Sequence, residues 1–152
     1  MSNKINQLKE DYEIFLSKID DYVEYLEEKA EKDNLSLDIN DKGALVILED
    51  FLKLNKVTVD DFEYEAASAY LGEFIRIHFN GEWDLCLDKK NNSLYYGTPV
   101  INGLSPVGGV LYSPFLVLQS FLVDYPPNWL METIMYEIHP EPLNLDDLPT
   151  EE

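Results

Sequence analysis

The stretch from Ala66 to Leu87, AASAYLGEFIRIHFNGEWDLCL, decides the fold class, because it turns from a helix into a strand within a few residues. Small residues dominate its first part and apolar side chains recur on one side, which predicts a buried central helix that its neighbours approach closely. Asn80-Gly81 ends this helix, with Gly81 expected in the left-handed conformation. From Trp83 onward apolar and polar residues alternate, as in a half-buried strand.

Downstream of this stretch the sequence predicts only short strands. After a polar turn, Leu94–Tyr96 is expected to be the second strand of a hairpin over about residues 82–97. Glycine and proline punctuate residues 97–109 and the chain after them, with one short strand expected near Val100-Ile101 and another near Val110-Leu111. Because the strands cluster rather than alternate with helices, a small antiparallel sheet is expected instead of a parallel βαβ arrangement.

Helices are expected before and after this sheet. A long first helix over residues 3–32 is predicted by apolar side chains spaced three and four apart, namely Ile5, Leu8, Tyr12, Phe15, Ile19, Tyr22 and Leu26. Similar patterns predict a second helix over residues 44–55 and a third that opens at Thr58. Ser113-Pro114 begins the next helix and Asn128 caps the last one. The expected fold class is therefore α+β, with three helices, a small antiparallel sheet and two C-terminal helices.

The length of 152 residues predicts one domain, residues 1–139, followed by an acidic, proline-containing tail over residues 140–152. Cys86 is the only cysteine, so the chain has no internal disulfide and no cysteine-based zinc site. No stretch approaches the roughly 18 apolar residues that would span a bilayer. The polar start, Met1–Gln7, lacks the apolar core of a signal peptide. A cytoplasmic location is therefore expected.

Charge is the most unusual feature of the composition. The chain has 11 basic and 30 acidic residues, a net charge of −19, and no lysine or arginine follows Lys90. Such a field repels phosphate backbones and anionic lipid, so we expect binding neither to nucleic acid nor to membranes. A basic protein partner would instead be attracted, and its encounter accelerated. The alternative is that the acidic residues only keep a small protein soluble.

The densest polar cluster lies at the end of the third helix and the start of the first strand. Glu73 and Arg76 are three residues apart on a helix and can pair. His78 and Glu82 could form a base and its orienting partner, or two metal ligands; the alternative is a partly buried histidine with a structural role. No motif identifies a catalytic residue, a cofactor or a metal, so none is expected and a non-enzymatic role is favoured.

Aromatic residues suggest a recognition surface. The chain has ten tyrosines and two tryptophans. Tyr95 and Tyr96 would point to opposite faces of one strand, and if Trp83 packs inward one of the two tyrosines looks outward near Val107–Val110. An aromatic patch rimmed by carboxylates is what a surface that recognises a basic partner offers. The alternative is that these tyrosines form the edge of the core.

The run Ala69-Tyr70-Leu71-Gly72-Glu73, followed by Gly81-Glu82-Trp83, resembles a signature of uncharacterised small acidic domains of bacteria. In these domains a Tyr-Leu-Gly-Glu helix leads through a glycine to a Gly-Glu-Trp hairpin strand. The resemblance implies that the helix crosses the sheet at Gly72 and that Trp83 starts the hairpin. Some of these domains resemble immunity partners of secreted bacterial toxins. The resemblance assigns no catalytic residue.

Three classes of function follow from these observations. The favoured one is a non-enzymatic acidic module that binds a basic protein, as immunity or inhibitor proteins do. The alternative is a small-ligand domain or weak enzyme, with a site around Glu73, His78, Glu82 and Trp83. The third is a homo-oligomer assembled through the apolar side of residues 3–32; a monomer or weak homodimer is expected.

Overall fold

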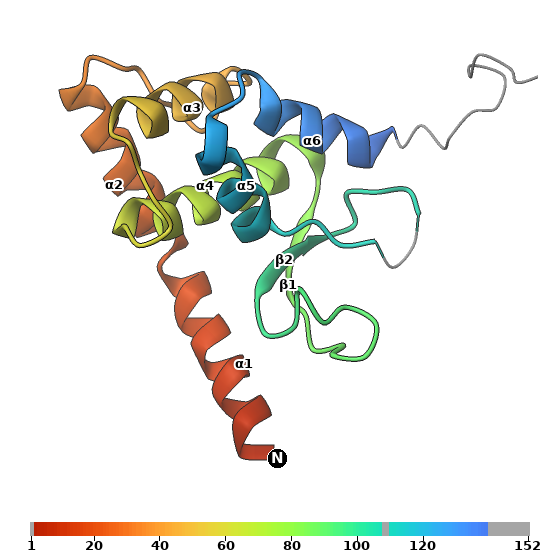
Figure 1. Cartoon of the computed structure of the whole chain (residues 1–152). Helices are drawn as coiled ribbons and strands as arrows, with labels where there is room; N and C mark the ends of the chain where they lie inside the picture. Colours follow the sequence, from red (N-terminus) through yellow and green to blue (C-terminus); the bar gives the residue numbers. More distant parts are fainter. Residues whose placement is uncertain (1, 108–109, 140–152) are drawn as a thin grey trace, which may run out of the picture.

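The computed structural model describes residues 2–107 and 110–139, which form six helices and a two-stranded antiparallel sheet (Figure 1). In chain order the elements are α1 (Ser2–Ser17), α2 (Ile19–Lys32), α3 (Ala44–Leu54), α4 (Phe62–Phe79), β1 (Glu82–Leu85), β2 (Pro99–Asn102), α5 (Pro114–Asp124) and α6 (Trp129–Ile138). The predicted α+β fold, with helices before and after a small antiparallel sheet, is confirmed. The predicted tail, residues 140–152, lies outside the described residues.

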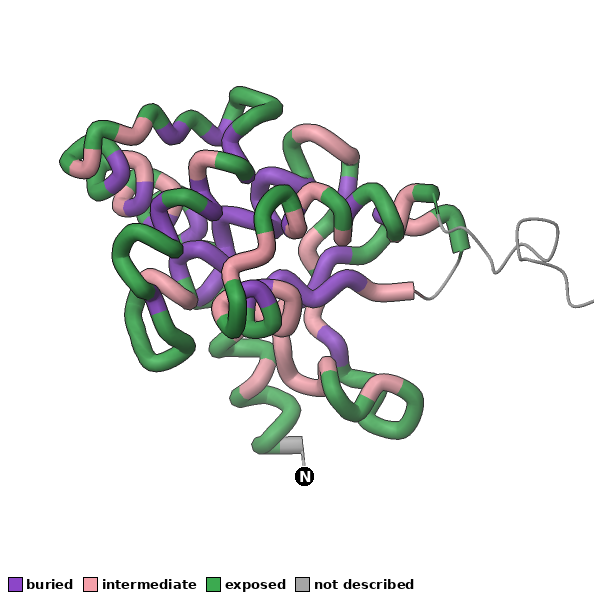
Figure 2. Tube along the Cα trace, turned by 45° about the horizontal axis from the view of Figure 1, so that its top comes forward, coloured by how far each residue is buried: buried purple, intermediate pink, exposed green. Residues whose placement is uncertain are grey.

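Helix α4 is the central element, as its small residues predicted. It packs against both α2 and α5, while α3 packs against α6. Ala66, Ala67 and Ala69 are completely buried, so the neighbouring backbones come close to that of α4. Figure 2 shows the buried residues gathered at the centre of the helical body. Within the described ranges, no helix is long and apolar enough to cross a membrane.

The predicted helix over residues 3–32 is helical nearly throughout but breaks at Lys18. The Ser17 hydroxyl donates to the Ile14 carbonyl at 2.6 Å, and the Lys18 N–H bonds the Phe15 carbonyl three residues back. These bonds compete with the regular helical ladder and tighten the last turn of α1. As a result α2 packs on the body while α1 extends away from it (Figure 1).

The sheet differs from the predicted hairpin in the position of its second strand. β1 pairs with β2 in the register Glu82↔Asn102 to Leu85↔Pro99, so the strand expected near Val100-Ile101 is confirmed and the one expected at Leu94–Tyr96 is not formed. The strand expected near Val110-Leu111 is replaced by a single bridge between Ile101 and Tyr112.

Turn chemistry explains why residues 94–96 are not a strand. The Asp88 carboxylate accepts from the Asn91 N–H and closes a turn. Two more turns follow, because the Tyr95 N–H bonds the Asn92 carbonyl and the Thr98 N–H bonds the Tyr95 carbonyl. Pairing with β1 therefore starts only at Pro99.

Two glycines permit the close approach of α4 and the sheet. A Cβ on Gly72 would lie 2.1 Å from the Trp83 ring, so the indole rests directly on the α4 backbone. A Cβ on Gly81 would lie 2.6 Å from the Ile101 side chain. The left-handed position after α4 is occupied by Asn80, with φ of 60°, and not by Gly81 as predicted. Gly81 is thus required by packing rather than by its backbone angles.

The two C-terminal helices begin in different ways. The Ser113 hydroxyl accepts from the Leu116 N–H at 3.2 Å, which confirms the predicted start of α5. Asn128 occupies the predicted N-cap position of α6, but its side chain makes no capping bond. The carboxylate of Glu49, from α3, takes that role and accepts from the N–H groups of Asn128 and Leu130, each at 2.8 Å. Helix α3 therefore fixes where α6 begins.

Candidate functional site

Glu73 and Arg76 of the predicted polar cluster come together with Trp83. Arg76 donates from Nε to Glu73 Oε1 at 3.0 Å and from Nη2 to Glu73 Oε2 at 2.5 Å. The Trp83 indole N–H donates to the same Oε1 at 3.2 Å. Glu73 is only 8% exposed, and its two oxygens are occupied by these donors. Glu73, which Arg76 holds in place, thus keeps the Trp83 indole against Gly72.

The other two members of that cluster lie apart. His78 Nε2 is 2.8 Å from the Ile39 carbonyl, and its ring packs on Phe74 with centroids 4.3 Å apart. Glu82 is exposed on β1. In the described part of the chain no hydrogen bond or ion pair joins His78 to Glu82, and no group of three or more histidine, cysteine, aspartate or glutamate side chains could hold a metal ion.

The two predicted tyrosines are both half-buried but have different surroundings. Tyr96 lies beside Lys89, whose Nζ is 5.6 Å from the ring centroid. Tyr95 lines a cavity of about 370 Å³ between α5 and α6, which we name the aromatic cavity. Its lining comes from the loop before β2, the segment after the Ile101 bridge and the two helices: Tyr95, Leu111, Tyr112, Ser113, Leu116, Val117, Trp129, Glu132, Thr133, Tyr136 and Glu137.

Helical spacing places the α6 residues in the aromatic cavity. Trp129, Thr133 and Tyr136 follow one another at intervals of four and three, and Glu132 and Glu137 lie beside them on the same face. The bridge between Ile101 and Tyr112 brings the chain to the start of α5, which supplies the opposite wall. The sheet and two helices thus position this face of α6.

Of the polar groups that line the aromatic cavity, the hydroxyls of Tyr112 and Thr133 have hydrogen-bond partners within the protein. The Tyr112 hydroxyl lies 2.7 Å from Thr133 Oγ1, and the Thr133 hydroxyl donates to the Leu130 carbonyl at 2.7 Å. Burial raises the pKa of Tyr112, and the charge of Glu137 raises it further. Burial also raises the pKa of Glu137. A cation in this cavity would therefore meet a carboxylate that has lost part of its hydration.

An apolar groove of about 610 Å³ adjoins the aromatic cavity on the other side of α6. It shares Glu132 and Tyr136 with the cavity and continues over Met131 and Met135 to the start of α3. Tyr136 is 64% exposed, although it is aromatic. The exposed face of α6 therefore presents large apolar side chains with a carboxylate between two hollows.

A third hollow, of about 490 Å³, is lined by four glutamates of α2: Glu24, Glu27, Glu28 and Glu31. One of them is engaged, because Glu27 Oε2 accepts from the Ile39 N–H at 2.9 Å. Leu35 and Leu37 contribute apolar wall. This acidic groove strengthens the negative field of the molecule but offers no aromatic residue.

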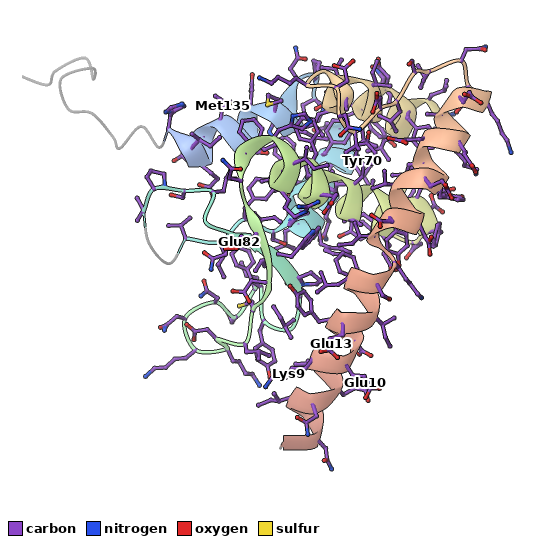
Figure 3. The ribbon with its side chains drawn as sticks, turned by 180° about the vertical axis from the view of Figure 1, so that it is seen from behind. Lys9, Glu10, Glu13, Tyr70, Glu82 and Met135 are labelled. Carbon is purple, nitrogen blue, oxygen red and sulfur yellow. The ribbon has the colours of Figure 1, made fainter. Side chains whose placement is uncertain are left out.

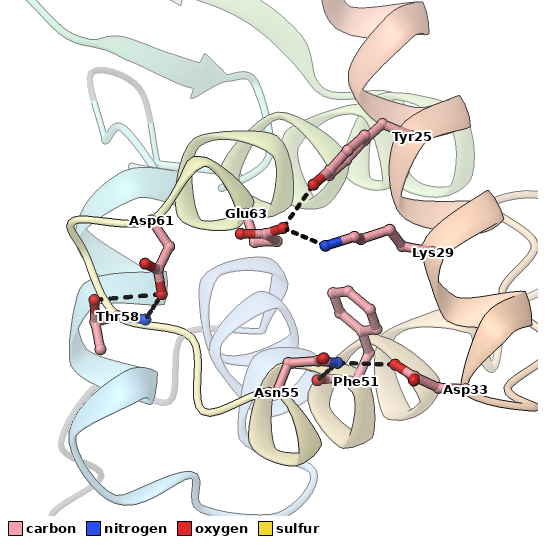
Figure 4. Close-up of polar contacts among 8 residues, drawn as sticks. All are labelled: Tyr25, Lys29, Asp33, Phe51, Asn55, Thr58, Asp61 and Glu63. Atoms are coloured by element: carbon pink, nitrogen blue, oxygen red, sulfur yellow. Dashed lines mark hydrogen bonds and ion pairs between the residues drawn. The ribbon is translucent and has the colours of Figure 1, made fainter.

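Few carboxylates are paired with a cation. Among the described residues two ion pairs form, Arg76 with Glu73 and Lys29 with Glu63. Figure 4 shows the second pair, in which Glu63 also accepts from the Tyr25 hydroxyl at 2.6 Å. Both pairs join elements of the fold or lie within one. Apart from the buried Glu49, most other described carboxylates lie at least partly exposed.

Sequence reasoning pointed to Tyr95 and to a carboxylate-rimmed aromatic surface but missed the residues of α6. None of Trp129, Glu132, Tyr136 and Glu137 was singled out from the sequence as a site residue. A signal existed, because Trp129, Glu132, Tyr136 and Glu137 recur at intervals of three, four and one on a chain segment that lacks lysine and arginine. That Tyr95, 34 or more residues away in sequence, lines the same cavity had no such signal.

Searches against models of protein families, against curated proteins and against solved structures find no match to this chain.

Proposed function

We propose that this protein is a non-enzymatic acidic module that binds a basic protein partner, in the manner of an immunity or inhibitor protein. The observation that carries the proposal is the face of α6, where aromatic side chains and the carboxylates of Glu132 and Glu137 line one hollow without any lysine or arginine. Interface cores are enriched in tryptophan and tyrosine, which supply much of the binding energy.

Long-range electrostatics supports the same proposal. The net charge of −19 creates a field that attracts cationic proteins and raises their association rate. Two ion pairs form in the described ranges, so most of the acidic side chains there have no cationic partner within the fold. The buried, free Cys86 is in keeping with a reducing compartment, and we place the interaction in the cytoplasm.

The alternative, a ligand site or weak enzyme at Glu73, His78, Glu82 and Trp83, has less support from the geometry. Glu73 is saturated by Arg76 and Trp83, and His78 lies against a backbone carbonyl. The principal hollows of the described chain are lined by other residues.

Capture of the partner from native lysate tests the proposal. The full-length protein is immobilised, and bound proteins are quantified at about 0.1 M and about 1 M salt, where the Debye length falls from ~10 Å to ~3 Å. We expect one stoichiometric, basic protein that is retained at low salt and released at high salt. The double variant E132Q/E137Q should lose it, whereas E10Q/E13Q, which removes the same charge from α1, should retain it.

The control residues lie far from the face of α6, so the two double variants separate the effect of that face from the effect of net charge. Glu10 and Glu13 lie on α1, at the opposite end of the molecule from Met135 of α6 (Figure 3). The proposal fails if no stoichiometric, salt-sensitive partner is captured. It also fails if both double variants lose the partner equally, because net charge alone would then explain the binding.

A further inference from the structure

We propose that the aromatic cavity binds one guanidinium group, supplied by an arginine side chain. This inference rests on the proposed function, because the arginine would belong to the basic partner, and it adds the site and the chemical group that is recognised. A free small molecule that carries a guanidinium is the other source of the same chemistry, and the experiments below separate the two.

The size of the cavity suits a head group on a short stem. Its volume of about 370 Å³ lies near the lower end of the roughly 300–1,000 Å³ typical of ligand sites. Leu116 and Val117 of α5 form an apolar wall. Such a wall suits the methylene stem of an arginine, which packs on apolar surface while its charged end seeks polar partners.

Aromatic rings favour a cation, and a planar one in particular. Trp129 and Tyr136 stand two turns apart on α6, and Tyr95 joins them from the loop before β2. Cations are attracted to the faces of such rings within about 6 Å of the centroid. A guanidinium stacks on aromatic faces and is more weakly hydrated than an ammonium, which favours arginine over lysine.

Two carboxylates complete the site, and within the described part of the chain neither forms an ion pair. Glu132 and Glu137 both line the cavity, and no lysine or arginine does. The hydroxyls of Tyr112 and Thr133 are engaged with each other, which leaves the carboxylates as the principal acceptors. A guanidinium presents five N–H donors in a planar fork and pairs with carboxylates through charge-assisted hydrogen bonds.

The neighbouring apolar groove indicates how the rest of the partner would continue. It shares Glu132 and Tyr136 with the aromatic cavity and is extended by Met131 and Met135. Methionine side chains adapt to irregular apolar surfaces. The recognised arginine is therefore expected to have an apolar residue close to it in the partner.

A nuclear magnetic resonance titration of the full-length, ¹⁵N-labelled protein tests the site directly. The probe is N-acetyl-arginine methylamide, and the matched control is the citrulline derivative, which has nearly the same shape without the charge. The readout is the indole N–H signal of Trp129, and that of Trp83, which is bound to Glu73, serves as an internal control.

We expect the Trp129 signal to shift saturably with the arginine derivative while the Trp83 signal stays in place. The citrulline derivative should bind at least about tenfold more weakly, because a charge-assisted hydrogen bond contributes at least about 1.4 kcal/mol. Equal binding of both compounds, or a shift of Trp83 alone, would overturn the inference.

The variants of the capture experiment serve here as well. E132Q/E137Q should weaken binding of the arginine derivative about tenfold or more, and E10Q/E13Q should leave it unchanged. Thermal unfolding of each variant shows whether its fold is intact. Undiminished binding by a folded E132Q/E137Q protein would also overturn the site.

The two proposals fail separately. If the arginine derivative binds the cavity but no basic protein is captured, the proposed function is wrong and the guanidinium belongs to a small molecule. If a basic protein is captured and E132Q/E137Q still holds it while the arginine derivative does not bind, the proposed function stands and the site is wrong.

Discussion

The position of the Trp83 ring requires that residue 72 has no side chain. The indole rests on the α4 backbone and is oriented by Glu73, which Arg76 in turn holds. This arrangement agrees with the sequence expectation that the helix crosses the sheet at Gly72. It makes Gly72 a position where even one methyl group cannot be added without moving a large ring.

Gly72→Ala should therefore destabilise the protein by at least about 2 kcal/mol, because overpacking a core forces side chains and backbone to shift. The midpoint of urea unfolding measures the loss. Gly43→Ala is the matched control, since a Cβ there would meet only the Asp41 carboxylate at 3.4 Å. Equal midpoints for the two variants would contradict the role given to Gly72.

The Tyr70 hydroxyl is the one buried side-chain polar atom, among the described residues, that lacks a hydrogen-bond partner. Tyr70 lies inside the molecule on α4 (Figure 3). Because an unsatisfied buried hydroxyl costs free energy, Tyr70→Phe should raise the free energy of unfolding by about 1 kcal/mol.

The control for Tyr70 is Tyr64→Phe, which removes a hydroxyl that donates to the Phe115 carbonyl at 2.7 Å. This variant should lose about 1 kcal/mol. Both are measured by chemical denaturation. A destabilised Tyr70→Phe protein would show that the hydroxyl is satisfied in solution.

Binding of a guanidinium in the aromatic cavity should depend on pH through Glu137. Burial raises its pKa, so its charge is lost at a higher pH than the ordinary value of about 4.3. Affinity for N-acetyl-arginine methylamide should therefore fall as the pH is lowered through this raised pKa, because the neutral carboxyl no longer attracts the cation.

Titrations at several pH values check this dependence. Glu137→Gln should flatten the fall, because the carboxyl whose burial raises its pKa is then missing from the cavity. Affinity that stays constant or rises as the pH is lowered would exclude a carboxylate at the binding site.

At the scale of elements, the start of α6 depends on a carboxylate from α3. Glu49→Ala would leave the N–H groups of Asn128 and Leu130 without their acceptor. We expect a loss of about 2 kcal/mol, with fraying that begins at Trp129 and weakens the aromatic cavity. Thermal unfolding measures it against Asp50→Ala, which removes the neighbouring, exposed carboxylate. Equal stabilities would show that Glu49 is not the cap.

The helices were predictable from sequence because their signals are local. The apolar periodicity of residues 3–32 and the Ser113-Pro114 start of α5 are readable from neighbouring residues. The break at Lys18 was not, because it comes from the bond between the Ser17 hydroxyl and the Ile14 carbonyl and from the short Lys18–Phe15 backbone bond, which the apolar spacing does not reveal. The position of β2 was also missed, since consecutive turns between Asp88 and Thr98 override the apolar run at 94–96.

The sequence indicated which type of surface the candidate site would be, but not which residues would form it. The excess of tyrosine and the missing cations indicated an aromatic surface rimmed by carboxylates, and Tyr95 does line such a hollow. Its partners on α6 are brought there by tertiary packing, as α6 packs on α3 and α5. For His78 the sequence was misleading. Its position near Glu82 suggested a site, but its ring nitrogen lies against the Ile39 carbonyl.

At the scale of the whole molecule, the net charge and the aromatic cavity both favour a basic partner. The net charge of −19 was evident from composition. The fold places two of the carboxylates, those of Glu132 and Glu137, beside aromatic side chains in the aromatic cavity. Long-range attraction would bring a basic partner to the surface, and the aromatic cavity would then select an arginine by contact. These two steps have different salt dependences, because screening weakens the first far more than the second.

The dissociation constant of the captured partner, measured as a function of salt for the native protein and for E132Q/E137Q, tests this account most directly. We predict that the native affinity falls steadily with salt and that the double variant binds about tenfold or more weakly at every salt concentration. An affinity that is independent of salt, or that is equal for the two proteins, would contradict it.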